Sequence, residues 1–168
     1  MKKIITTVVI LSLIGFIACN TDTQKASEEN SGTQVEENIV EEEALAPASE
    51  RITLDNKGVG VIKNIELAEV IDEEMVKKGM ELFQTNCSAC HKPDKRFIGP
   101  SPKGIMKRRS PEWIMNMILD PQLMVEQDRC AKDLLVEFNG AAMANQNMTE
   151  EQARHILEYF RTLEETQI

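Results

Sequence analysis

The stretch FQTNCSACHKP, residues 83–93, decides the fold of this chain. It holds two of the four cysteines and one of the two histidines. Two cysteines three positions apart, with histidine next, occur in zinc sites, in thiol redox pairs, in structural disulfides and in covalent haem attachment. The rest of the chain has to supply what each of these sites needs.

A structural zinc site needs four ligands, which commonly come as two cysteine pairs. Cys130 and His155 would have to complete the set, and each stands alone far along the chain. A thioredoxin-like pair follows a strand and opens a helix, whereas this motif follows a predicted helix. CxxCH is the signature of c-type haem attachment, in which both thiols form thioethers with the haem. We therefore favour haem and keep zinc, a redox pair and a disulfide as alternatives.

The first 18 residues are predicted to be a signal peptide, because two lysines precede an apolar run, residues 4–17, that is short for a membrane span. Ala18 before Cys19 resembles the lipobox of bacterial lipoproteins. That resemblance implies a lipidated Cys19 and a membrane anchor. An uncleaved anchor and an ordinary signal peptide are the alternatives. All three place the working part outside the cytoplasm, on the periplasmic side of a bacterial membrane.

Residues 19–50 are predicted to be the lipidated cysteine and a disordered acidic tether. Residues 20–50 contain nine acidic residues against Lys25, a net charge of −8. Such a segment buries too little apolar surface to offset the entropy lost on ordering. The whole chain has a net charge of −9. This charge argues against nucleic acid as a partner, since phosphates require a basic face.

The remainder is predicted to be an extended arm, residues 51–67, followed by an all-α domain, residues 68–168. Start signals and apolar spacing predict four helices and no convincing sheet. The helices are expected at residues 73–86, capped by Asp72; from Pro111 to about Asp120, capped by Ser110; at residues 130–138; and from Thr149 onward, with a capping box to Gln152.

This domain resembles the class I cytochrome c family. In that family the helix before CxxCH carries a glycine and an aromatic residue four positions apart, which Gly79 and Phe83 match. The resemblance implies that this helix crosses the last helix at Ile156 and Tyr159. It also implies the class I fold, with helices packed around one covalently bound haem c.

The same resemblance implies the haem ligands. Cys87 and Cys90 hold the haem, and His91 ligates its iron. The carbonyl of Pro100, in a Gly-Pro pair after the motif, accepts the histidine Nδ1–H and fixes the ring. Met143, in the loop before the last helix, takes the place of the second axial ligand.

Two other side chains are alternatives to Met143 as the distal ligand. Met148 lies in the same loop, and His155 lies within the last helix, where a surface or boundary position is the simpler interpretation. A thioether ligand raises the haem potential relative to two histidines. It also fills the sixth site, which favours electron transfer. The alternative function is a haem sensor or an enzyme-like cytochrome with an open distal site.

Basic and aromatic residues follow the haem motif. The resemblance implies that the indole N–H of Trp113 and the charge of Arg108 or Arg109 contact the haem propionates. Core packing of the tryptophan and a solvated arginine face are the alternatives. Residues 92–109 contain seven lysines and arginines against Asp94. This basic patch predicts steering toward an acidic partner.

No nucleophile or base pair stands out, so we predict a monomeric electron carrier rather than an enzyme. Its partners are expected to be redox proteins, a donor and an acceptor. Residues 98–121 look like the small cytochromes that accompany nitrous oxide reductase, which implies a copper enzyme as acceptor. A terminal oxidase is the other expected acceptor. Cys130 is left over, and we expect it to be buried and inert or to pair between molecules.

Overall fold

The computed structural model describes residues 46–163. The chain divides into two units, residues 1–34 and 35–168, and every described residue belongs to the second unit. The predicted signal peptide, the predicted lipidation site Cys19 and the tether up to residue 45 lie outside the described residues. Within residues 46–163 the structure is helical, with one isolated β-bridge and no strand. The all-α prediction is confirmed for this part of the chain.

Helix α2, Glu73–Asn86, leads directly into the CxxCH motif. Asp72 caps it, because its Oδ1 accepts the backbone N–H groups of Glu74 at 2.9 Å and Met75 at 3.0 Å. Two glutamates in the first turn stabilise the helix, because their negative charges lie at the positive end of the helix dipole. Both ends of this helix agree with the prediction.

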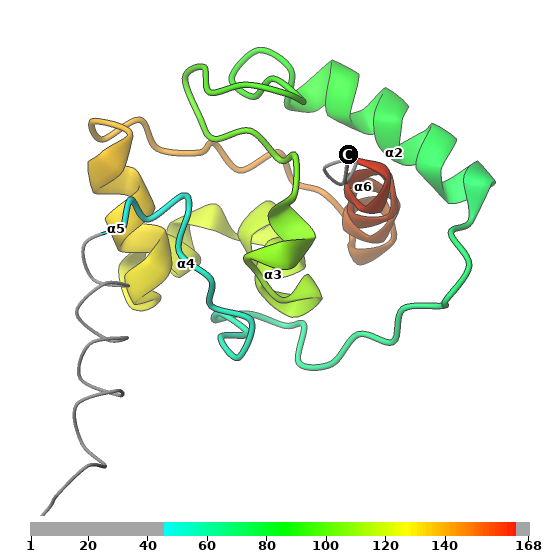
Figure 1. Ribbon diagram of the computed structural model, residues 1–168, viewed down its shortest axis with the longest axis horizontal. Coiled ribbons are helices and arrows are strands. Elements are labelled where there is room, and N and C mark those ends of the chain that lie inside the picture. Colours follow the sequence, from blue (N-terminus) through cyan, green and yellow to red (C-terminus); the bar gives the residue numbers. More distant parts are fainter. Residues whose placement is uncertain (1–45, 164–168) are drawn as a thin grey trace, which may run out of the picture. The chain divides into compact units, whose positions relative to one another are not determined.

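Helix α6, Glu150–Thr162, packs against α2 as the last helix of the domain (Figure 1). Gly79 makes the crossing possible, since a Cβ at this position would lie 2.0 Å from the carbonyl oxygen of His155. The ring of Phe83 lies 5.6 Å from that of Tyr159 and 5.8 Å from that of Phe160, centroid to centroid. The predicted crossing is confirmed, and Phe160 joins its aromatic cluster.

Helices α3, Pro111–Leu119, and α4, Pro121–Gln127, meet at Asp120. Ser110 caps α3 as predicted. Helix α4 was not predicted, because the Asp-Pro pair was interpreted only as a stop signal. The same pair also starts a helix: Asp120 Oδ1 accepts the N–H of Leu123 at 3.0 Å, and proline suits the first helical position.

Helix α5, Arg129–Glu137, follows α4 and ends before the loop that leads to α6. Asp128 caps it, and Oδ1 of this side chain accepts the N–H of Ala131 at 2.8 Å. The prediction of residues 130–138 is one residue late at each end, within the ordinary uncertainty of helix boundaries.

Residues 46–67, which we call the N-terminal strap, pack onto these helices. Ala48 and Ile62 are only 3% and 6% exposed. Asn116 of α3 accepts the N–H of Ile62 at 3.0 Å and donates to the carbonyls of Lys57 and Ile62 at 3.0 and 2.9 Å. Residues 46–50 were predicted to be tether and residues 51–67 an extended arm. The strap differs because the side chains of Asn116 and Arg109, and the bond from the Thr53 N–H to the Arg108 carbonyl, pair with its backbone.

The core lies between α2, α3 and α6. On α6 its members are three and four positions apart, as on an amphipathic helix, whereas α3 contributes three consecutive apolar side chains. Those no more than 3% exposed on these helices are Phe83, Trp113, Ile114, Met115, Ala153, Ile156 and Leu157.

Candidate functional site

A single cavity between the end of α2, α3, α5 and α6 brings together all the cofactor-binding residues that the sequence predicted. Apolar side chains make up most of the remaining wall, among them Phe83, Ile114, Ile118 and Phe160. The predicted residues that line it are Cys87, Cys90, His91, Pro100, Arg108, Arg109, Trp113 and Met143.

His91 is held in one orientation by the segment that follows it. Its Nδ1 lies 2.8 Å from the carbonyl oxygen of Pro100. A carbonyl only accepts hydrogen bonds, so Nδ1 carries the proton and Nε2 keeps its lone pair for a metal. Gly99 lies against the same ring, where a Cβ would come within 2.5 Å of the His91 Cε1 atom. The predicted role of Pro100 is therefore supported by geometry.

The two cysteines of the motif lie on one tight turn. The N–H groups of Cys90 and His91 both donate to the carbonyl of Cys87, at 3.1 and 2.9 Å. Burial, and secondarily the neighbouring Cys90, raises the pKa of Cys87 to about 11. A thiol redox pair needs a cysteine with a lowered pKa, so this environment does not suit one.

Zinc finds no support either. Within residues 46–163, no group of three or more His, Cys, Asp or Glu side chains could hold a metal ion. Cys130, a residue that a zinc site would need, is 6% exposed on α5, and burial raises the pKa of its thiol. This agrees with the expectation that Cys130 is buried and inert.

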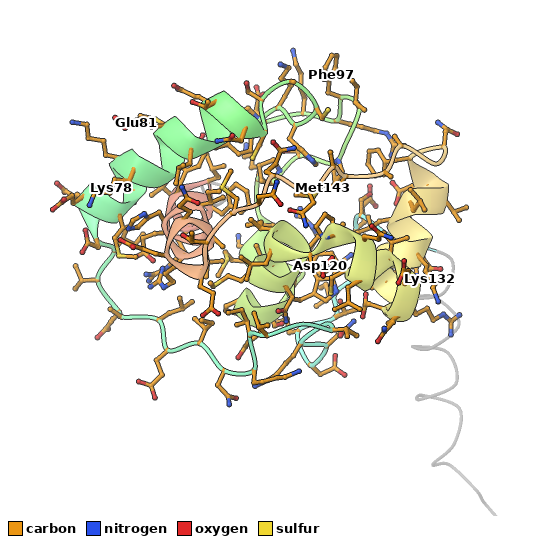
Figure 2. The ribbon with its side chains drawn as sticks, turned by 180° about the vertical axis from the view of Figure 1, so that it is seen from behind. Lys78, Glu81, Phe97, Asp120, Lys132 and Met143 are labelled. Carbon is orange, nitrogen blue, oxygen red and sulfur yellow. The ribbon has the colours of Figure 1, made fainter. Side chains whose placement is uncertain are left out.

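Met143 lies on the segment between α5 and α6, apart from the loop after α2 that carries Phe97 (Figure 2). It is half-buried and lines the cavity. Met148 packs against the hydrophobic core instead, and His155 is 9% exposed within α6, beside Glu151. Neither alternative ligand lines the cavity. The geometry therefore favours Met143 among the three.

Arg109 is 2% exposed at the wall of the cavity. Its two terminal nitrogens donate to the backbone carbonyls of Ala48, Arg51 and Arg108. Its Nε is buried without a hydrogen-bond partner among the described residues, and burial lowers the pKa of the guanidinium. A buried donor with no acceptor is costly, so this atom has the chemistry to meet an anionic group.

Trp113 differs from the prediction. Its indole Nε1–H donates to Asp128 Oδ1 at 3.0 Å, and the side chain is 3% exposed. Asp128 is itself 6% exposed and needs donors, since an unpaired buried carboxylate is unfavourable. In this structure the indole N–H is thus committed to Asp128 rather than left for a propionate.

The basic patch is smaller than its sequence indicates. Arg109 is buried, and Arg96 pairs with Glu137, with 2.7 Å between Nη1 and Oε1. Lys95 and Lys103 remain on the surface. Phe97 and Ile98 are 52% and 49% exposed in the same segment. Lys92 Nζ lies 5.0 Å from the ring centroid of Phe97, so a lysine adjoins this exposed apolar pair.

The family model for cytochrome c matches residues 76–164. The chain belongs to the cytochrome c family. Comparison with curated proteins gives no significant match. Among solved structures, cytochrome c from Rhodothermus marinus is 40% identical, with a TM-score of 0.60, over 72% of this chain and 95% of that one.

Two engineered forms of that protein are similar at the same 40% identity, over 72% of this chain and 96% of theirs. One is the variant Rma TDE, with a TM-score of 0.60. The other is the same variant bound to a carbene intermediate, with a TM-score of 0.58.

A cytochrome c carries one covalently attached haem c, and the family supports an electron-carrier role with redox proteins as partners. The residues of this cytochrome c fit that cofactor. The cavity combines CxxCH, a largely apolar wall and the unpartnered Nε of Arg109. Domains of this family are typically exported. Within the described residues, no helix is long and apolar enough to cross a membrane.

The polar contacts that tie the N-terminal strap to the helices beside the cavity were not predicted from the sequence. Ser49 and Arg51 of the N-terminal strap bond to Glu137 and Asp133 of α5. Asp128 joins Trp113 to Asn56, whose Nδ2 donates to Oδ2 at 2.7 Å. Single charged residues at helix ends give no spacing signal, so only the folded chain reveals these partners.

Proposed function

We propose that the protein is a single-haem electron carrier in which Cys87 and Cys90 attach the haem and His91 and Met143 ligate its iron. The observation that carries this proposal is the shared cavity: residues from both ends of the domain line it together. The haem supplies the electron chemistry when bound, taking up and releasing one electron at a time. The protein supplies attachment, an axial pair and burial.

The chain's own residues have separate tasks in this proposal. Pro100 keeps the proton on His91 Nδ1 and so directs Nε2 to the metal. The apolar wall keeps water out. Arg109, with its unpartnered Nε, is proposed to meet a haem propionate, and Arg108 at the cavity wall to assist by charge. Trp113 supports the wall through its bond to Asp128.

We further propose that the carrier is a monomer, exported and held to the periplasmic side of a bacterial membrane by a lipid on Cys19. The exposed surface of Phe97 and Ile98, with Lys92 against the Phe97 ring and the exposed Lys95 in the same segment, is proposed as the docking face for an acidic redox partner. Nitrous oxide reductase and a terminal oxidase are the candidate acceptors. Electron-transfer rates should fall as salt rises, and rates independent of ionic strength would exclude steering by these charges.

A second function has a specific observation behind it. An engineered relative is bound to a carbene intermediate, and alanines on both sides of Met143, Ala142 and Ala144, are exposed. An enzyme-like or sensor cytochrome with an open distal site is the corresponding alternative for this chain.

Absorption spectra of the exported full chain, oxidised and reduced, with and without carbon monoxide, test the proposal. We expect sharp c-type bands on reduction, a weak near-red sulfur–iron band when oxidised, and no response to carbon monoxide. Strong carbon monoxide binding would favour the open-site alternative. A colourless protein, after expression with competent maturation machinery, would exclude the haem proposal altogether.

A further inference from the structure

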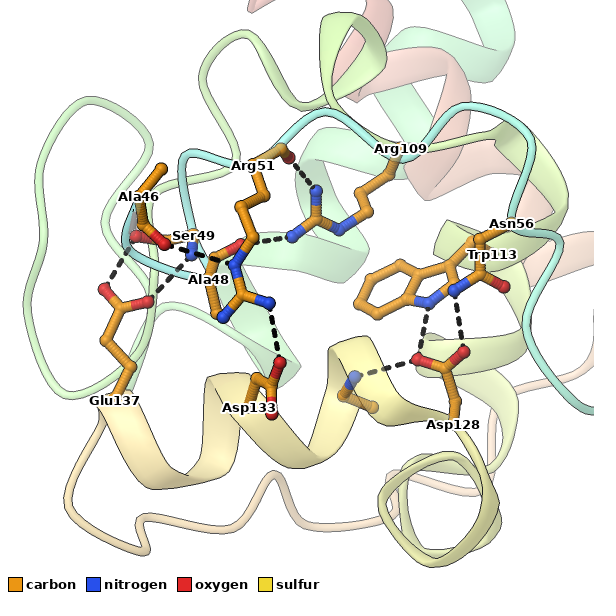
Figure 3. A network of polar contacts seen from close by, with 11 residues as sticks. Ala46, Ala48, Ser49, Arg51, Asn56, Arg109, Trp113, Asp128, Asp133 and Glu137 are labelled. Carbon is orange, nitrogen blue, oxygen red and sulfur yellow. Dashed lines mark hydrogen bonds and ion pairs between the residues drawn. The ribbon is translucent and has the colours of Figure 1, made fainter. Parts of the chain in front are cut away.

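Glu137, the last residue of α5, joins the N-terminal strap to the end of that helix (Figure 3). Its Oε1 accepts the hydroxyl of Ser49 at 2.7 Å, and its Oε2 accepts the Ser49 N–H at 2.8 Å. The side chain is 15% exposed. A polar side chain at the end of a short helix is therefore fixed by a segment 88 residues away in the sequence.

Arg96 reaches the same residue from the segment that follows the haem motif. Its Nη1 donates to Glu137 Oε1 at 2.7 Å and its Nη2 to the Glu137 carbonyl at 2.9 Å. The guanidinium also lies 3.9 Å from the ring centroid of Phe138, which is buried and lines the cavity. We call Ser49, Arg96 and Glu137 the Glu137 clasp. It connects the chain after His91 to the chain before Met143.

The loop that carries Met143 depends on its ends for its position. Near Glu137 the chain reverses through two positive φ angles, and the N–H of Gly140 donates to the Leu135 carbonyl at 2.8 Å. Beyond this reversal, the hydrogen bonds of residues 142–148 in the described chain stay within the loop. No hydrogen bond ties Met143 itself to a helix within residues 46–163.

We propose that Glu137 is a positioning residue that holds the Met143 loop over the haem cavity through the clasp. The proposal rests on the proposed function, in which Met143 is the distal ligand. Charge-assisted hydrogen bonds are about twice as strong as neutral ones, and Arg96 makes two to this one residue. Opening the clasp frees the end of α5 and the start of the loop, so Met143 leaves its place more often.

The charge on Glu137 is secure at neutral pH. Burial acts to raise the pKa of its carboxyl, but the hydrogen bonds from Ser49 and Arg96 hold it below the ordinary value. Replacing the carboxylate by an amide keeps the shape and removes the charge. Glu137→Gln is therefore the variant of choice, and Glu126→Gln is its matched control, because Glu126 is exposed on α4 and its carboxylate accepts a hydrogen bond from Gln122 of the same helix.

The test is an alkaline titration of the oxidised, haem-loaded full chain, followed by the near-red sulfur–iron band. Alkaline conditions offer competing ligands, so the midpoint reports how firmly Met143 is held. Losing a charged hydrogen bond should lower the equilibrium constant for the closed position of the loop about tenfold. This change lowers the midpoint of the titration by about one pH unit. Glu126→Gln should leave the midpoint unchanged. Arg96→Gln should also lower the midpoint, and the double variant should lower it by less than the sum of the two single changes, because both substitutions remove the ion pair between Arg96 and Glu137.

Two results would overturn the proposal. Equal midpoints in Glu137→Gln and Glu126→Gln would remove Glu137 from the positioning of Met143, even if urea unfolding shows lower stability. That pattern indicates a purely structural role. A wild-type protein without the near-red band would reject Met143 ligation itself, and this separates failure of the proposed function from failure of the clasp. If Glu137→Gln does not fold, Ser49→Ala and Arg96→Lys test the same contacts with smaller changes.

Discussion

The segment that carries His91 and the segment that carries Met143 reach the same cavity with very different support. His91 follows a 14-residue helix that is locked onto α6 at Gly79. Its ring is fixed by Pro100 and bordered by Gly99. Met143 lies in a loop whose hydrogen bonds, within the described chain, are local.

This difference assigns separate tasks to the two sides. The proximal side, which comprises the α2–α6 crossing and residues 87–100, is over-determined by contacts, which suits the permanent attachment of a cofactor. The distal side, residues 139–149, is set by its ends, and small changes there should alter ligation without unfolding the protein. Substitutions on the two sides should therefore be separable by experiment.

The largest loss of stability is expected for Gly79→Ala, a substitution on the proximal side. The new Cβ would meet the His155 carbonyl oxygen at 2.0 Å, and backbone cannot yield as a side chain does. The α2–α6 crossing must open, and overpacking of this severity should cost about 3 kcal/mol or more in unfolding free energy. Urea unfolding of the haem-loaded protein measures it. A loss below about 1 kcal/mol would show that the crossing is not tightly fixed.

The next largest effect is expected for Glu158→Gln, also on the proximal side. Glu158 is 1% exposed and accepts hydrogen bonds from Arg154, Arg161 and the N–H of Asp72. Burial acts to raise its pKa, but these partners hold the pKa below its ordinary value. We expect a loss of about 2 kcal/mol at neutral pH.

The pH dependence of that loss has a defined sign. A carboxyl whose pKa is lowered by folding stabilises the protein above its unfolded pKa of about 4.3, and this stabilisation disappears as pH falls through the folded pKa. The stability gap between wild type and Glu158→Gln should thus shrink on acidification below about pH 4.3. Glu81→Gln, at an exposed position on α2, the helix that packs against α6, is the control (Figure 2). A gap that widens in acid would contradict the assignment.

A smaller effect is expected for Gly140→Ala, on the distal side. No atom lies within 4 Å of the new Cβ, but the backbone has φ +76°, a conformation that residues other than glycine rarely adopt. The cost should be about 1 kcal/mol. Urea unfolding compares the two variants. Gly140→Ala introduces backbone strain without a clash on the distal side, whereas Gly79→Ala introduces a clash on the proximal side. Equal losses would remove the distinction between the two sides.

The smallest effect is expected for Asp133→Asn, which breaks the ion pair of Arg51 and α5 at 2.6 Å. Both side chains are partly exposed, at 22% and 31%, and pairs of this kind contribute about 0.5 kcal/mol. The effect should fade in high salt, since exposed charges are screened. A loss of several kcal/mol would show that the N-terminal strap holds the distal side more strongly than its contacts indicate.

The proximal side could be predicted from sequence because its signals are local. CxxCH has a fixed spacing, Gly79 and Phe83 lie one helical turn apart, and capping residues mark the ends of α2 and α6. Each signal lies within a few residues of the structure it specifies. The local signal was incomplete at Asp120, where one Asp-Pro pair ends α3 and also starts α4, which was not predicted.

The contacts between the N-terminal strap and the helices could not be predicted, because they join residues far apart. Ser49 and Glu137 are 88 positions apart, and Asn56 and Asp128 are 72 apart. The strap has no helical period, so residues 46–50 were assigned to the tether and residues 51–67 to an extended arm. Trp113 lines the cavity, but the partner of its N–H is the Asp128 side chain that also caps α5, and sequence alone did not connect the two.

Met143 as the distal ligand is tested most directly by spectra of three haem-loaded proteins: wild type, Met143→Ala and Met148→Ala. Ligation by Met143 predicts a near-red band in wild type and Met148→Ala, and its loss in Met143→Ala alone. Carbon monoxide should then bind the reduced Met143→Ala protein and leave the other two unchanged. A band that survives in Met143→Ala, or that disappears in Met148→Ala, would contradict the assignment.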